Sequence, residues 1–95
     1  MNIQIKTIAE GCHLSVNVKI QNQVLLNLTD NDEGRVNIFS GMTYRFEWFV
    51  FAAQESHVRI EAVVTPENDG FHPMVLDKNY PAGAQDGNVF LFTLN

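Results

Sequence analysis

The segment MTYRFEWFVF, residues 42–51, decides the fold class, because it alternates as a β-strand does and then stops alternating. When it is extended, one face presents the side chains of Met42, Tyr44, Phe46, Trp48 and Val50. The other face begins polar, with Arg45 and Glu47, and ends apolar, with Phe49 and Phe51. A sheet face in water normally keeps its polar residues, so we expect another part of the chain or a partner to cover Phe49 and Phe51.

The residues before this segment predict a three-stranded meander. Residues 14–20 alternate between apolar and polar side chains, Val24, Leu26 and Leu28 continue the apolar set, and residues 30–34 form a polar turn that ends in glycine. A three-residue loop would set Ile20 opposite Val24, Val18 opposite Leu26 and Val16 opposite Leu28. We expect Val36 and Ile38 to return opposite Leu28 and Leu26.

The meander should end at Ser40 and Gly41. A two-residue turn there would set Ile38 against Thr43 and Val36 against Arg45, which mixes the apolar and polar faces. We therefore expect the chain to cross into a second sheet at this point.

Beyond the crossing, charge pairing predicts a second hairpin. Glu47 would face Arg59 and Arg45 would face Glu61, with residues 52–54 as the loop. The other face would then match Trp48 with Val58, Phe46 with Ile60 and Tyr44 with Ala62. This register assigns Tyr44 and Trp48 to the core.

The remaining segments of the chain also predict β-strands. Residues 3–5 and 88–94 have strand character, and the last segment is apolar on both sides. Between them, residues 66–86 form a long connection, whose apolar members we expect to cover a sheet face: Phe71, Met74, Val75, Leu76 and Tyr80. We predict one domain over residues 1–95, an antiparallel two-sheet sandwich of about seven strands, Ig-like in size.

Composition restricts the classes of partner and compartment. The formal charge is −5, with six Lys and Arg against eleven Asp and Glu, which disfavours nucleic acid and anionic membrane surfaces. No apolar run approaches the roughly 20 residues of a membrane-spanning helix. Cys12 is the single cysteine and cannot form an internal disulfide, which favours a reducing compartment. The first residues do not resemble a secretory signal, so we expect a cytoplasmic chain or one whose leader was removed.

The sequence offers little catalytic or metal chemistry. Cys12 and His13 are adjacent and would point to opposite faces of a strand, so they do not form a nucleophile and base pair, and we expect no enzyme activity. The acidic turn supplies Asp30, Asp32 and Glu33, to which Asp69 could add an oxygen for calcium, which takes 6 to 8. The alternative for these carboxylates is ordinary turn chemistry in solvent.

We therefore expect a small non-catalytic module that binds a protein partner or a second copy of itself, without a cofactor. Its contacts would come from an aromatic strand face or an open sheet edge, through Phe49, Phe51 and His57, with Tyr80 from the long connection. The alternative function is carbohydrate- or calcium-dependent recognition through the acidic loops.

Overall fold

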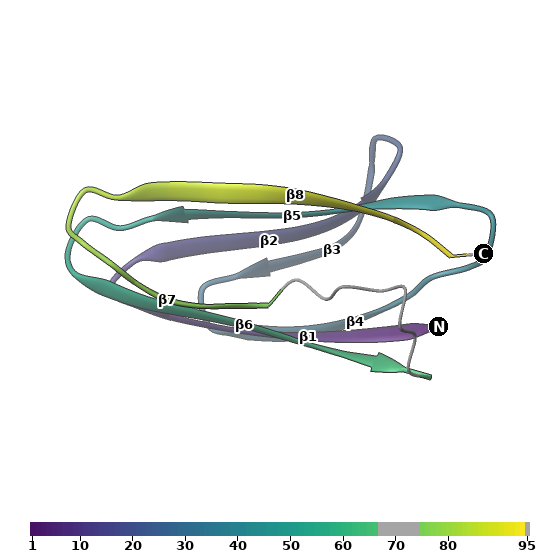
Figure 1. Ribbon diagram of the computed structural model, residues 1–95, viewed down its shortest axis with the longest axis horizontal. Helices are drawn as coiled ribbons and strands as arrows, with labels where there is room; N and C mark the ends of the chain where they lie inside the picture. The colour runs from purple at the N-terminus through teal and green to yellow at the C-terminus, as the bar shows by residue number, and fades with distance from the viewer. Residues whose placement is uncertain (67–74, 95) are drawn as a thin grey trace.

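The computed structural model describes residues 1–66 and 75–94 and contains two antiparallel four-stranded sheets packed face to face (Figure 1). Sheet A has the order β4 (Asp32–Asn37), β1 (Asn2–Glu10), β6 (Ser56–Thr65) and β7 (Leu76–Tyr80). Sheet B has the order β3 (Gln23–Thr29), β2 (His13–Ile20), β5 (Thr43–Phe51) and β8 (Gln85–Thr93). The predicted all-β sandwich is confirmed, with eight strands in the described residues in place of seven.

The core lies between the sheets and follows the alternation of the sequence. β5 directs Tyr44, Phe46 and Val50 inward, and all three are buried. Sheet A meets them with the buried side chains of Ile3, Ile5, Val36, Val58 and Ile60. The hydroxyl of Tyr44 accepts the backbone N–H of Phe39 at 2.8 Å, which satisfies the polar end of an otherwise apolar residue. Tyr44 is therefore a core residue as predicted, and Trp48 packs at the margin of the core.

The predicted hairpin between β2 and β3 is correct near its base and wrong near its tip. Val16 faces Leu28 and Val18 faces Leu26, but Lys19 faces Val24, so Ile20 does not face Val24. A β-bulge causes the difference, because Leu25 is inserted between the residues that face Val18 and Lys19. The bulge leaves Leu25 exposed at the edge of the sandwich.

The predicted meander is wrong, because the chain already changes sheets between β3 and β4. β4 pairs with β1, with Val36 opposite Ile3, and not with β3. Asp30 adopts a left-handed φ of 57°, and the buried hydroxyl of Thr7 bonds to the backbone on both sides of the crossing. Val36 and Leu28 still share one core, but they approach it from opposite sheets.

The predicted change of sheets at Ser40 and Gly41 is confirmed, since β4 belongs to sheet A and β5 to sheet B, but it returns the chain to the sheet of β2 and β3 and does not lead to a second one. The predicted pairing of residues 44–48 with 58–62 is wrong, because β5 lies between β2 and β8 while β6 lies between β1 and β7. The charged side chains of this predicted hairpin form ion pairs with other residues. Glu47 pairs with Lys19 at 2.6 Å and with Arg45 at 3.0 Å, and Arg59 pairs with Glu61 of its own strand.

The predicted long connection contains β7 and the first residues of β8. Phe71 and Met74, which we expected to cover a sheet face, lie outside the described residues. Of the other expected covering residues, Val75 is exposed and Tyr80 is buried. No helix in the described part of the chain could cross a membrane.

Candidate functional site

The outer face of sheet B carries the aromatic residues singled out in the sequence. Phe49 is 51% exposed and Phe51 39%, so both side chains remain accessible in the folded chain. The register sets Phe49 beside Ser15 on one side and Gly87 on the other. Because Gly87 has no side chain, an open hollow of about 510 Å³ lies between Phe49 and Val89. A Cβ atom at Gly87 would lie 2.9 Å from the carbonyl oxygen of Trp48, so this floor accepts no larger residue without a shift.

β8 forms one edge of sheet B and directs half of its backbone groups away from the sheet. Ala52 N–H donates to Ala84 O at 2.9 Å, in the register that pairs Phe51 with Gln85. In an antiparallel pair, hydrogen-bonded and non-hydrogen-bonded positions alternate. The even-numbered residues of β8 therefore bond to β5, and the odd-numbered ones present N–H and C=O to the edge.

Two of these edge donors are satisfied by side chains of β8 itself. Asp86 Oδ1 accepts the N–H of Gly87 at 2.9 Å, and Asn88 Oδ1 accepts the N–H of Val89 at 2.8 Å. These bonds occupy positions where a neighbouring strand would bond. Leu91 follows a phenylalanine and has no such adjacent acceptor, and its side chain is 62% exposed.

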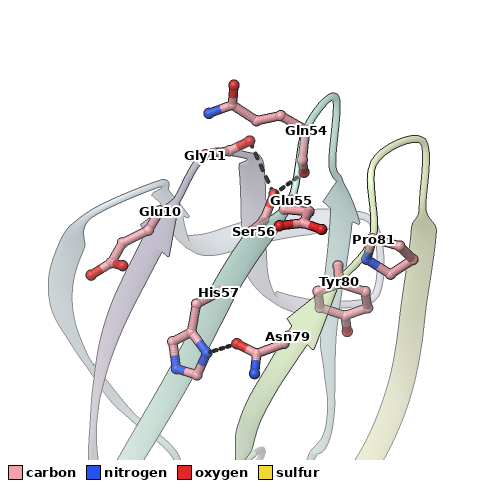
Figure 2. A pocket seen from close by; sticks show the side chains of 9 residues that line it. All are labelled: Glu10, Gly11, Gln54, Glu55, Ser56, His57, Asn79, Tyr80 and Pro81. Carbon is pink, nitrogen blue, oxygen red and sulfur yellow. Dashed lines mark hydrogen bonds between the residues drawn. The ribbon is translucent and has the colours of Figure 1, made fainter.

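His57 and Tyr80, predicted to join the aromatic surface, lie instead in sheet A beside a polar hollow of about 750 Å³ at the end of the sandwich (Figure 2). His57 Nδ1 lies 2.6 Å from Asn79 Oδ1, and its Nε2 lies 2.8 Å from Asp77. Tyr80 is buried and donates its hydroxyl to Asp86 at 2.8 Å. The predicted four-residue surface is thus divided between two sheets, because β6 and β7 do not join sheet B.

Ser56 and His57, which both line the polar hollow, each form hydrogen bonds with other groups and not with one another. The Ser56 hydroxyl lies 3.0 Å from the carbonyl oxygen of Gly11 and 2.6 Å from that of Gln54, whereas the His57 ring points away from it toward Asn79 (Figure 2). Burial raises the pKa of the Cys12 thiol, which keeps this sulfur in its less nucleophilic neutral form.

Two carboxylates of the predicted calcium site accept backbone N–H groups, and a third accepts a side-chain amide. Asp30 Oδ1 accepts the N–H of Leu14 at 3.0 Å, Asp32 Oδ1 accepts that of Glu33 at 2.9 Å, and Glu33 accepts a bond from Gln4. In the described residues, no three His, Cys, Asp or Glu side chains gather closely enough to hold a metal ion. Asp69, the fourth predicted ligand, lies outside those residues. The described geometry therefore assigns Asp30 and Asp32 to the support of the crossing between sheets.

Asp86 should make the stability of the fold depend on acid. The Tyr80 hydroxyl and then the Gly87 amide lower the pKa of this carboxyl, so its charged form favours the folded state. This contribution is complete above the ordinary aspartate pKa of about 4 and is lost as the pH falls through the lower folded-state value. We expect Asp86→Asn to flatten the decline in unfolding free energy below about pH 5, as measured by urea denaturation across pH.

The exposed Glu10 provides the control for this measurement, because Glu10→Gln also removes one carboxylate from the same end of the fold. The pH profile of Asp86→Asn is compared with that of this variant, so that the loss of one negative charge is common to both. Glu47, whose pKa is lowered mainly by the hydrogen bond from Lys19, should maintain part of the acid dependence in both variants. Identical pH profiles for wild type and Asp86→Asn would contradict the assignment.

Comparison of the chain with protein-family models, with curated proteins and with solved structures finds no match.

Some of the exposed residues in the candidate surfaces had a signal in the sequence, and others did not. Val89 and Leu91 lie in the final segment, which the sequence already showed to be apolar on both faces. The exposure of Leu25 had no such signal, because it depends on the bulge.

Proposed function

We propose that this chain is a non-catalytic protein-interaction module that binds a partner strand along the edge of β8 that no strand of the described residues covers, and that its simplest partner is a second copy of itself. The observation that supports this proposal best is that β8 is a long edge strand without the lysine or proline residues that usually prevent strand addition. It is nine residues long, it contains no Lys, Arg or Pro, and it exposes Val89 and Leu91. Proteins usually protect exposed edge strands from pairing with other chains by placing charged residues, especially lysine, or proline or a β-bulge there. Strand addition uses main-chain hydrogen bonds for affinity and alternate side chains for specificity.

The sequence of β8 is complementary to itself in an antiparallel register centred on Phe90. Val89 then faces Leu91 of the second copy and Leu91 faces Val89, so the exposed apolar side chains of both copies meet on one face. These residues are odd-numbered and direct their backbone groups to the edge, and pairing would replace the bond from the Val89 N–H to Asn88 Oδ1 with a main-chain bond to the second copy. Moving the register by two residues would set Leu91 against Gly87, which offers no side chain, in one direction, and Val89 against Thr93 in the other.

Charge does not oppose this register at short range. Asp86 faces Leu94 of the second copy, and the two Asp86 carboxylates lie eight residues apart along the strand direction, about 26 Å at roughly 3.3 Å per residue. That separation exceeds the Debye length of about 8 Å at physiological ionic strength. Each copy carries −5, so added salt should strengthen the association.

The test is the mass of the chain by light scattering as a function of concentration. The wild type should move from 10.7 kDa toward twice that mass, whereas Leu91→Lys should stay at 10.7 kDa because a lysine at the edge opposes strand addition. Val63→Lys, at an exposed valine of β6 in sheet A, is the matched control and should behave as wild type. A wild-type chain that remains monomeric up to millimolar concentration would refute self-association through β8.

A further inference from the structure

A third hollow, of about 820 Å³, lies at the opposite end of the sandwich from the polar one. Figure 1 shows this end, where the β2–β3 hairpin and the connection from β4 to β5 lie together, and where the carbonyl oxygens of Met1 and Leu94 accept the N–H groups of Ile38 and Gly41. Sheet B has β3 at one edge and β8 at the other, so this hollow is separate from the proposed strand-binding edge. Its volume is in the range typical of small-molecule sites, about 300–1,000 Å³.

Apolar side chains surround this hollow although they are open to solvent. Phe39 is 65% exposed, and Met42 and Leu25 are exposed as well. Leu25 reaches this position because it is the extra residue of the β-bulge, and bulges commonly redirect a side chain at a functional site. Tyr44 closes the inner end, and its hydroxyl is already engaged by the backbone of Phe39 and by the sulfur of Met42.

The charge of this hollow is opposite to that of the chain. Among the described residues, its lining contains Arg35 and no carboxylate, although the chain as a whole has eleven acidic and six basic residues. Arg35 forms no ion pair with any residue of the described ranges. The remaining polar lining consists of uncharged carboxamides: Gln21, Asn22, Gln23 and Asn37.

We infer that this hollow binds a small carboxylate with an apolar body. The apolar part would lie against Leu25, Phe39 and Met42, where it removes exposed hydrocarbon from water. The carboxylate would take the planar guanidinium of Arg35, which matches two carboxylate oxygens at once. A neutral ligand would leave Arg35 without a partner, and a cationic ligand would be repelled by it, so the sign of the charge is the specific part of the inference.

The experiment is a titration of the isotopically labelled chain with 4-phenylbutyrate, followed by the backbone amide resonances in two-dimensional NMR. Saturable shifts should appear at the amides of Leu25, Asn37, Phe39 and Met42, and those of Val89 and Leu91 should not move. The alcohol and the amine with the same phenylbutyl body separate charge from apolar contact. The alcohol should bind about threefold to fivefold more weakly, which is the size of a partly exposed ion pair, and the amine should not saturate.

Variants locate the interaction. Arg35→Gln should weaken phenylbutyrate about fivefold and bring its affinity down to that of the alcohol. Arg45→Gln, the same change on the outer face of sheet B, should leave the affinity unchanged. Equal affinity for the acid, the alcohol and the amine would overturn the inference, as would shifts centred on Val89 or the absence of shifts at about 10 mM ligand. Both variants replace exposed residues, so their folded spectra serve as the check on structure.

Discussion

Replacement of Phe46 by alanine should lower the free energy of unfolding by about 3–5 kcal/mol. The ring is fully buried at the centre of sheet B, where the register sets it between Val18 of β2 and Phe90 of β8. Its centroid lies 6.1 Å from that of Phe90. Truncation removes the transfer free energy of the ring and leaves a cavity between two sheets that cannot fully close. Domains of this size have a total stability of roughly 5–15 kcal/mol, so the loss should be visible in a urea or thermal unfolding curve.

The control is Phe49→Ala, which makes the same chemical change three residues along the same strand. Phe49 points to the outer face of sheet B, so its removal should cost less than about 1 kcal/mol. The two variants together test the parity of β5. Equal losses would show that the two rings are equally buried, which would contradict the assignment of inner and outer faces.

Replacement of Thr7 by valine should lower the free energy of unfolding by about 2–3 kcal/mol, although the two side chains have nearly the same shape. The Thr7 hydroxyl is buried, donates to the carbonyl oxygen of Asp30 at 2.7 Å and accepts the N–H of Asp32 at 3.1 Å. Valine would leave both backbone groups without this partner, and an unsatisfied buried group costs about 1–3 kcal/mol. Because these bonds connect β1 to the crossing between β3 and β4, the amide of Asp32 should also lose protection from hydrogen exchange.

Thr29→Val provides the comparison, since Thr29 is an exposed residue of β3. It should change stability by no more than about 0.5 kcal/mol. Should Thr7→Val prove as stable as Thr29→Val, the hydroxyl of Thr7 would not be what supports the crossing.

The distribution of side chains between core and surface was predictable because it depends on local geometry. Successive side chains of an extended segment point to opposite faces, whatever the segment pairs with. The alternation of residues 42–51 therefore assigned Tyr44, Phe46 and Val50 to one face, and these are the buried residues of β5. The same rule placed Phe49 and Phe51 opposite them, and both are exposed.

The neighbours of each strand were less predictable, because several partners satisfy the same charges. The sequence offered Arg59 and Glu61 as partners for Glu47 and Arg45, and that register agreed with every apolar pair. In the folded chain Glu47 forms an ion pair with Lys19 of β2 instead, with 2.6 Å between Lys19 Nζ and Glu47 Oε1. A carboxylate on an outer face accepts any nearby cation, so charge pairing within one hairpin does not identify that hairpin.

The candidate surfaces divide in the same way. The sequence pointed to Phe49, Phe51 and a doubly apolar final strand, and the fold presents them on the outer face and edge of sheet B. It also placed His57 and Tyr80 with them, which the fold separates because β6 and β7 belong to sheet A. The hollow beside Arg35 had no sequence signal, since it is formed by a bulge in β3 and by the connection from β4 to β5.

By itself, then, the amino-acid sequence determined that this chain forms a β-sandwich and which side chains face its interior. Only the tertiary structure decided where the chain changes sheets and which strand forms an edge. The physical reason is that strands are joined by backbone N–H and C=O groups, which are nearly the same in every residue and so do not distinguish one neighbour from another. That choice is made when both sheets close on a single core, as the first crossing shows: Thr7 of β1 bonds to the turn at Asp30 and Asp32, residues far from it in the sequence.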